Sequence, residues 1–134
     1  MGLLDIFYKE VNRWRDKSQS EKDEQGVVKR ALRKSLTKFD FVWKDQILGG
    51  SYKREEQKQI FGVFSEEFMD LAVEVEDILK DEDITNNLRE ISRAFGNYSR
   101  NSTPGIGGYF ENPIPKEIGE ALNRINEINK KLKE

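Results

Sequence analysis

Residues 27–48 read VVKRALRKSLTKFDFVWKDQIL, and this stretch decides the fold. Its apolar residues recur every three or four positions: Val28, Leu32, Leu36, Phe39, Trp43 and Ile47. That spacing places them on one face of an α-helix. Gly49 and Gly50 follow at once, and glycine is common just past the end of a helix. The stretch therefore predicts a long amphipathic helix that buries one face.

Four more segments show the same periodicity. We expect an amphipathic N-terminal helix over residues 3–17, and further helices from Ser51 to about residue 80, from Asp83 or Thr85 to about residue 98, and from Pro115 onward. Polar residues 18–25 are interpreted as a loop. Residues 99–115 contain all three prolines and are expected to be irregular. No segment shows the sustained period-2 alternation of a half-buried strand.

The sequence therefore predicts an all-α protein, an antiparallel bundle of four to five helices with one long Gly/Pro-rich connection before the last helix. A length of 134 residues suggests a single domain over residues 1–134. Charged residues make up 36% of the chain, whereas about a quarter is usual. This composition suits amphipathic helices with charged outer faces.

The composition excludes several classes of site. The chain contains no cysteine and no histidine, so disulfides, thiolate chemistry, the usual imidazole base and most zinc sites are excluded. No apolar run reaches the roughly 18 residues of a membrane span, and no membrane partner is expected. The N-terminal residues lack the pattern of a secretion signal, and we therefore expect a cytoplasmic protein.

Between Val63 and Asp83 the chain carries nine carboxylates and one lysine. Five of the carboxylates recur at spacings of 3 and 4 and share one side of a helix: Glu67, Asp70, Glu74, Asp77 and Asp81. Residues 27–48 carry six positive and two negative charges, so we expect these two helices to lie side by side with their charged flanks in contact. Such pairs would select helix neighbours more than they would add stability, because an exposed pair contributes only about 0.2–1 kcal/mol.

The same carboxylates suggest an alternative function. Residues 66–70 (EEFMD) and 74–77 (EVED) resemble the EExxE and ExxD motifs of the all-α nucleotide pyrophosphatases. The resemblance implies a Mg²⁺-dependent nucleotide phosphohydrolase whose metal ligands would be Glu67, Asp70, Glu74 and Asp77. Magnesium binds oxygen ligands and requires neither histidine nor cysteine. In that family the two motifs lie on separate helices, whereas here one helix carries both, so a second helix would have to supply further ligands.

A basic cluster suggests a second alternative, in which nucleic acid phosphates would contact Lys29, Arg30, Arg33, Lys34 and Lys38. The sequence pI of about 5.4 disfavours this interpretation, because proteins that track phosphates usually have a basic domain. Nucleic acid is therefore not the expected partner.

The preferred interpretation is a non-enzymatic helical interaction or regulatory protein that needs no cofactor and acts through contacts with a partner protein. Tyr109 and Phe110 are too apolar to move freely in water, so they either pack over an end of the bundle or contact a partner. The candidate partner contacts are Arg100, Tyr109 and Phe110. The first and last helices are both amphipathic and terminal, and one of them could bury its apolar face in a second copy. A homodimer is therefore a further hypothesis.

Overall fold

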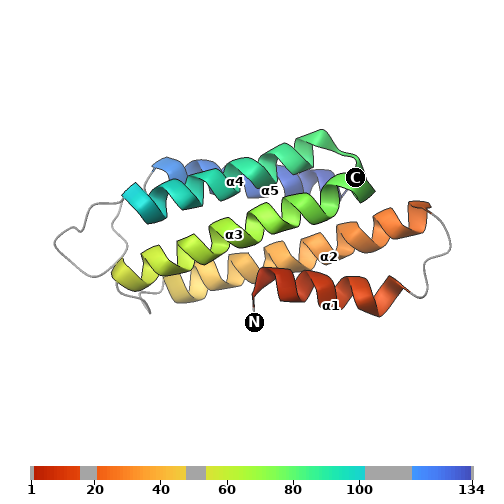
Figure 1. Ribbon diagram of the computed structural model, residues 1–134, viewed down its shortest axis with the longest axis horizontal. Helices are drawn as coiled ribbons and strands as arrows, with labels where there is room; N and C mark the ends of the chain where they lie inside the picture. Colours follow the sequence, from red (N-terminus) through yellow and green to blue (C-terminus); the bar gives the residue numbers. More distant parts are fainter. Residues whose placement is uncertain (1, 16–20, 48–53, 102–115, 134) are drawn as a thin grey trace.

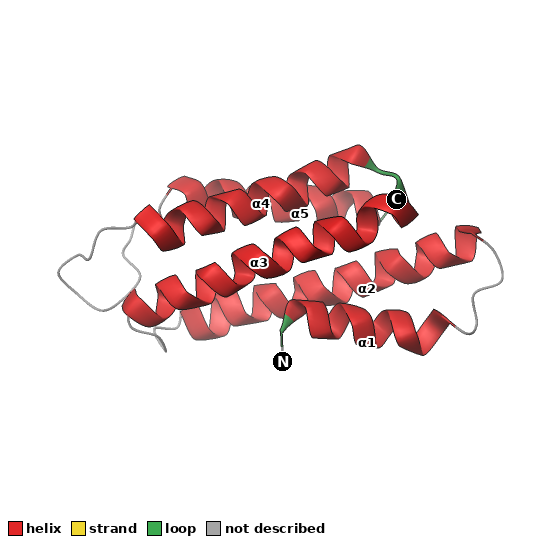
Figure 2. Cartoon of the chain, viewed as in Figure 1, coloured by secondary structure: helices red, strands yellow, loops and turns green. Residues whose placement is uncertain are grey.

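The structure is a computed structural model, and it describes residues 2–15, 21–47, 54–101 and 116–133. Five α-helices account for nearly all of these residues (Figure 2): α1 Leu3–Arg15, α2 Glu21–Phe41, α3 Arg54–Leu79, α4 Glu82–Asn101 and α5 Lys116–Leu132. α2 continues into a π-helical segment of six residues, η1, Val42–Ile47. The described part of the chain contains no strand, and the all-α prediction is confirmed.

Successive helices run in opposite directions and form the predicted antiparallel bundle (Figure 1). α2, α3, α4 and α5 close a ring, in which each helix packs against the next and α5 packs back against α2. α1 lies outside this ring, along α2, and makes a smaller contact with α3. The ring places the α2–α5 edge and the α3–α4 edge on opposite sides of the molecule.

The predicted apolar faces form the core of the bundle. The six seam residues of α2 and η1 are all buried: Val28, Leu32, Leu36, Phe39, Trp43 and Ile47. The ring centroid of Phe39 lies 4.9 Å from that of Phe64, 5.5 Å from that of Phe68 and 5.4 Å from that of Phe95. Aromatic pairs at such distances add about 0.5–1.5 kcal/mol beyond the burial of their area. This cluster joins α2, α3 and α4.

α3 and α4 share the largest helix–helix interface, and small residues line it. Ser65 Oγ donates a hydrogen bond to the Ser92 carbonyl at 2.7 Å, and Ser92 Oγ donates one to the Ser65 carbonyl at 2.6 Å. A Cβ added to Gly96 would lie 2.9 Å from Ser65 Oγ, which is too close for the present packing. We call this interface the serine seam; its residues are Gly62, Ser65, Ser92, Gly96 and Ser99. Their small side chains let the two backbones approach closely.

Helix boundaries differ from the expectations in two regions. α2 begins at Glu21, so residues 21–25 are helical and their interpretation as a loop is wrong. Polar and charged side chains are compatible with an exposed first turn, and acidic residues there favour the positive end of the helix dipole. α4 continues to Asn101, so residues 99–101 are helical rather than irregular. Residues 102–115, Gly49, Gly50 and Ser51 lie outside the described residues.

The turn between α3 and α4 uses a different cap from the one expected. Lys80 has a φ of 52°, in the left-handed region that ends a helix. Asp81, and not Asp83 or Thr85, is the N-cap of α4, because its Oδ1 accepts a hydrogen bond from the backbone N of Ile84 at 3.2 Å. Sequence alone could not choose among three neighbouring residues that are all good caps.

Candidate protein interaction surface

The five acidic residues of α3 and its C-terminal turn have three different roles. Glu67 accepts a hydrogen bond from the backbone N of Leu4 at 3.0 Å, in the first turn of α1, where backbone donors have no partner within the helix. Glu74 accepts one from the Tyr8 hydroxyl at 2.6 Å, and this bond is the main cause that raises the pKa of Tyr8 to about 12. Two of the five carboxylates therefore attach α1 to α3.

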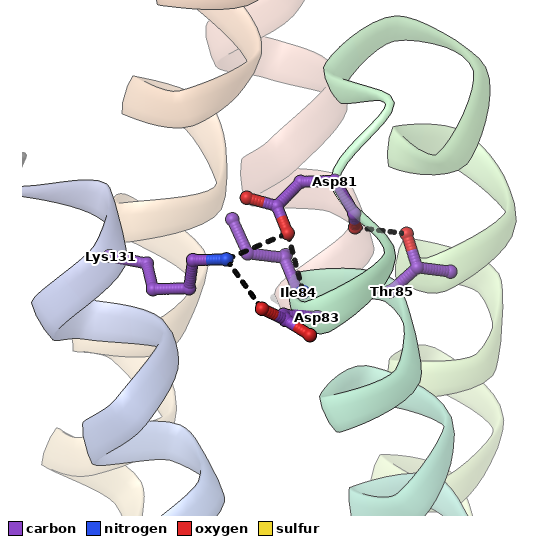
Figure 3. A network of polar contacts seen from close by, with 5 residues as sticks. All are labelled: Asp81, Asp83, Ile84, Thr85 and Lys131. Atoms are coloured by element: carbon purple, nitrogen blue, oxygen red, sulfur yellow. Dashed lines mark hydrogen bonds and ion pairs between the residues drawn. The ribbon is translucent and has the colours of Figure 1, made fainter.

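Asp81 joins α5 to the turn between α3 and α4 (Figure 3). Besides capping α4, its Oδ1 accepts a hydrogen bond from Lys131 Nζ at 2.9 Å, and Lys131 Nζ also lies 3.0 Å from Asp83 Oδ2. Burial alone would raise the pKa of Asp81, but the bonds from Lys131 and Ile84 outweigh burial and lower it below its ordinary value. The hydrogen bond to Asp81 and, after it, the one to Asp83 raise the pKa of Lys131.

Glu10 is a buried carboxylate on α1, with only 7% of its surface exposed. Its Oε1 lies 3.0 Å from Lys34 Nζ of α2 and accepts a hydrogen bond from Trp14 Nε1 at 3.0 Å. Burial opposes the ionisation of Glu10, but the bonds from Lys34 and Trp14 outweigh it, so the pKa of Glu10 falls below its ordinary value of 4.5. α1 also has a buried bond to α2, because Ser35 Oγ donates a hydrogen bond to the Leu3 carbonyl at 2.9 Å. We call the three attachments of α1 that involve carboxylates the clasp; they are Leu4–Glu67, Tyr8–Glu74 and Glu10–Lys34.

α3 presents a mixed acidic and apolar surface to solvent. Three apolar side chains are exposed, to 53% for Val63, 40% for Met69 and 59% for Val73. Three carboxylates on the same side are exposed, and none forms an ion pair with a residue that the structure describes. We call this surface the acidic–apolar face; it comprises Val63, Glu66, Met69, Asp70, Val73 and Asp77. Of the five acidic residues predicted to share one side of the helix, Asp70 and Asp77 are therefore the two that remain exposed to a partner.

A groove between α3 and α4 borders this face. It is lined by small residues of the serine seam and by five larger side chains: Glu66, Met69, Asp70, Arg93 and Arg100. Arg100, which the sequence suggested as a partner contact, is exposed near the end of α4 and donates a hydrogen bond to Asn97 Oδ1 at 3.1 Å. Tyr109 and Phe110 lie outside the described residues.

Sequence reasoning missed the exposed apolar residues of this face. A signal was present, because helical spacing places Val63 and Val73 with Asp70 and Asp77 and not with the buried Phe64. Two valines that share a helix side with carboxylates, and not with the buried apolar residues of α3, are the pattern that would have indicated a mixed surface.

The carboxylates considered as metal ligands do not converge. Glu67 and Glu74 bond to α1, whereas Asp70 and Asp77 face solvent. α5, a helix that could have supplied further ligands, packs against α4 and α2. Within residues 2–15, 21–47, 54–101 and 116–133, no three acidic side chains come together in an arrangement that could hold a metal ion.

α2 and α3 pack against each other as expected, but the basic residues of α2 form no ion pair with the five acidic residues. The expected contact of their charged flanks is therefore wrong for the part of the chain that the structure describes. α1 takes two of the basic side chains: Lys34 binds Glu10, and the Arg30 guanidinium lies 4.7 Å from the centroid of the Trp14 ring. The physical reason is the position of α1, which covers one flank of α2. The basic cluster considered for nucleic acid is thereby divided between two flanks of the helix.

Comparison of the chain with family models, with curated proteins and with solved structures gives no match in any of the three. None of the described helices combines the length and apolar character that crossing a membrane requires. The surfaces of the chain itself are therefore the basis for a functional proposal.

Proposed function

We propose that this protein is a non-enzymatic, cytoplasmic interaction module that binds a partner protein through the acidic–apolar face of α3. One observation carries the proposal: Val63, Met69 and Val73 are exposed beside carboxylates that have no ion-pair partner among the described residues. Covering apolar surface contributes about 25 cal/mol per Å². Clustered apolar side chains on a surface are a known mark of interaction sites.

The chemistry of the face favours a basic amphipathic helix as the partner surface. The apolar stripe of such a helix would cover Val63 and Val73, while its lysines or arginines would approach the surrounding carboxylates. Charge complementarity of this kind raises association rates and disfavours acidic partners more than it raises affinity. The groove beside α3 extends the contact area toward Arg100.

A second copy of this chain is a weaker candidate for that partner. α2 is the basic amphipathic helix of the chain, and its apolar seam is already buried within the bundle. α1 and α5 also bury their apolar faces, through residues such as Phe7 and Ile125, so a homodimer would need another surface. The homodimer stays a prediction, and sedimentation at high micromolar concentration distinguishes dimer from monomer.

Quantitative affinity capture from the source cells tests the proposal with three forms of the protein. Val63→Ser/Val73→Ser removes the apolar part of the face, and Phe41→Ser removes a side chain that is equally exposed, at 53%, on α2. We expect the wild type and Phe41→Ser to retain the same partners and the double variant to lose them. Thermal melts establish that all three are folded. Retention of the same partners by the folded double variant would refute the proposal.

A further inference from the structure

A groove of about 470 Å³ runs between α2 and α5, on the side of the ring opposite the α3–α4 edge. Because the two helices run antiparallel (Figure 1), the middle of α2, at Arg33 and Thr37, faces the C-terminal half of α5. The residues that line the groove are all polar or cationic: Arg33, Thr37, Asn126, Asn129, Lys130 and Lys133. The two groups of residues lie far apart in the sequence, so only the folded bundle brings them together.

The charges of this groove are of one sign. Arg33, Lys130 and Lys133 line it without any carboxylate, so the lining carries three positive charges. The groove beside the acidic–apolar face instead combines two carboxylates with two arginines, and the groove at the α3–α4 turn combines three carboxylates with two cations. Positive charge is therefore concentrated at the α2–α5 edge of a chain whose net charge is −2.

The polar groups in this groove do not hold the bundle together. Arg33 and Lys133 form no ion pair with the described helices, and the side-chain amides of Asn126 and Asn129 form no hydrogen bond with them. Two other cations on this part of α2 contact α1, since Arg30 stacks on Trp14 and Lys34 binds Glu10. Arg33, in contrast, faces the groove and forms no ion pair or ring contact with the described residues of α1.

Helix electrostatics explains only part of this arrangement. Lys130 and Lys133 lie near the C-terminus of α5, where cations favour the negative end of the helix dipole. Lys130 Nζ also lies 3.6 Å from Glu127 Oε1, but this exposed pair contributes little. Neither effect accounts for Arg33, which comes from the interior of α2, or for a lining without carboxylates.

We propose that the α2–α5 groove binds an anion that carries at least two phosphate groups. A guanidinium binds phosphate oxygens in a bidentate manner, and lysines act as point charges beside it. The carboxamides of Asn126 and Asn129 add donors and acceptors that orient the ligand. Cations on both walls of the groove suit a row of phosphates better than a single one. The site is independent of the proposed function, because it lies on the opposite side of the ring.

Titration monitored by ¹⁵N NMR of the full chain tests the proposal with two probes, inorganic triphosphate and a short oligothymidylate. The side-chain amide signals of Asn126 and Asn129 and the backbone signal of Thr37 report on the groove itself. We expect saturable shifts at these signals at about 20 mM salt that weaken steeply at about 200 mM, because binding releases counterions. Shifts with triphosphate alone identify free polyphosphate compounds as the ligand, and shifts with both probes identify a nucleic acid backbone.

A pair of charge-matched variants separates the site from general electrostatic attraction. Arg33→Gln/Lys133→Gln removes two cations from the groove, and Lys9→Gln/Lys116→Gln removes two exposed cations elsewhere. We expect the groove variant to weaken binding about tenfold or more and the control to leave it within about twofold of the wild type. Groove signals that do not move with either probe would overturn the proposal. Equal loss of affinity in both variants would overturn it as well.

Discussion

α3 is held on its two sides by different means. Toward α4, the serine seam joins hydroxyls to backbone carbonyls across a close contact between small residues. Toward α1, two bonds of the clasp reach α3: Glu67 accepts a hydrogen bond from the backbone N of Leu4, and Glu74 accepts one from the hydroxyl of Tyr8, which is 38% exposed. The seam therefore depends on shape, whereas the clasp depends on charge and on hydrogen bonds that water can replace.

This difference separates two levels of stability. The ring of α2, α3, α4 and α5 closes without α1, so opening of α1 need not break the ring. Proteins open locally in units of different stability, and the clasp adds to an attachment that α1 also makes by burying Leu3, Phe7 and Val11. The seam contains no ionisable side chain, whereas the clasp contains three carboxylates, so only the clasp should respond to pH.

The largest effect is expected at the seam. Gly96→Val would place side-chain atoms where even a Cβ meets Ser65 Oγ at 2.9 Å, and we expect a loss of about 2–3 kcal/mol in the free energy of unfolding. Gly119→Ala is the matched control, because a Cβ there meets nothing within 4 Å and alanine favours a helix by up to about 1 kcal/mol. Urea denaturation measures both. A Gly96→Val protein as stable as the wild type would show that the serine seam does not depend on close contact between small residues.

At the clasp, Glu10→Ala is expected to cost about 1 kcal/mol, since half-exposed Lys34 can turn to water while Trp14 loses its acceptor. Amide hydrogen exchange should show faster exchange in α1 and no change in α4. Glu127→Ala, which removes an exposed pair on α5, should change stability by less than about 0.5 kcal/mol. Equal acceleration of exchange in α1 and α4 would show that the two regions unfold as one unit.

Acid should weaken the attachment of α1 in the wild type. The folded-state pKa of Glu10 is lowered, so its contribution is complete above its ordinary value of 4.5 and is lost as the pH falls through the lower folded-state pKa. Fluorescence of Trp14 in a Trp43→Phe background follows this change. Asp81 also has a lowered pKa and weakens the whole bundle in acid, so Glu10→Gln is needed to isolate the effect. We expect the wild type to show a change in Trp14 fluorescence before the bundle unfolds in acid, and Glu10→Gln to lack that change.

The smallest effect is expected for Tyr8→Phe, at about 0.5 kcal/mol, because the lost hydrogen bond is partly exposed. The pKa of Tyr8 is raised from 10.0 to about 12, so its contribution is complete below pH 10.0 and is lost as the pH rises toward 12. Denaturant midpoints at neutral and alkaline pH measure the effect of Tyr8→Phe on stability and the dependence of that effect on pH. Wild type and Tyr8→Phe should differ at neutral pH and converge near pH 12; a constant difference would contradict the Tyr8–Glu74 bond.

Much of the fold was predictable because helix periodicity is a local property. The apolar face of α2 and η1, from Val28 to Ile47, is buried as its spacing indicates. The order of the helices follows from the turn signals between them. Helix ends were less predictable, as the cap at Asp81 illustrates, because several adjacent residues could cap α4 equally well. The residues of the candidate surfaces were predictable only in part: Asp70 and Asp77 were singled out, but Val63 and Val73 were not.

The sequence by itself determined which residues of each helix face inward, because that depends only on spacing along one element. The tertiary structure alone decided which charged side chains meet. α1 lies along α2 and contacts Arg30 and Lys34, whereas Arg33 lines the groove beside α5. Charges act over short distances in water, with a screening length of about 10 Å at 0.1 M salt, so their partners depend on which helices become neighbours. Packing of the apolar faces sets that neighbourhood, and the pattern of charges along one helix does not reveal it.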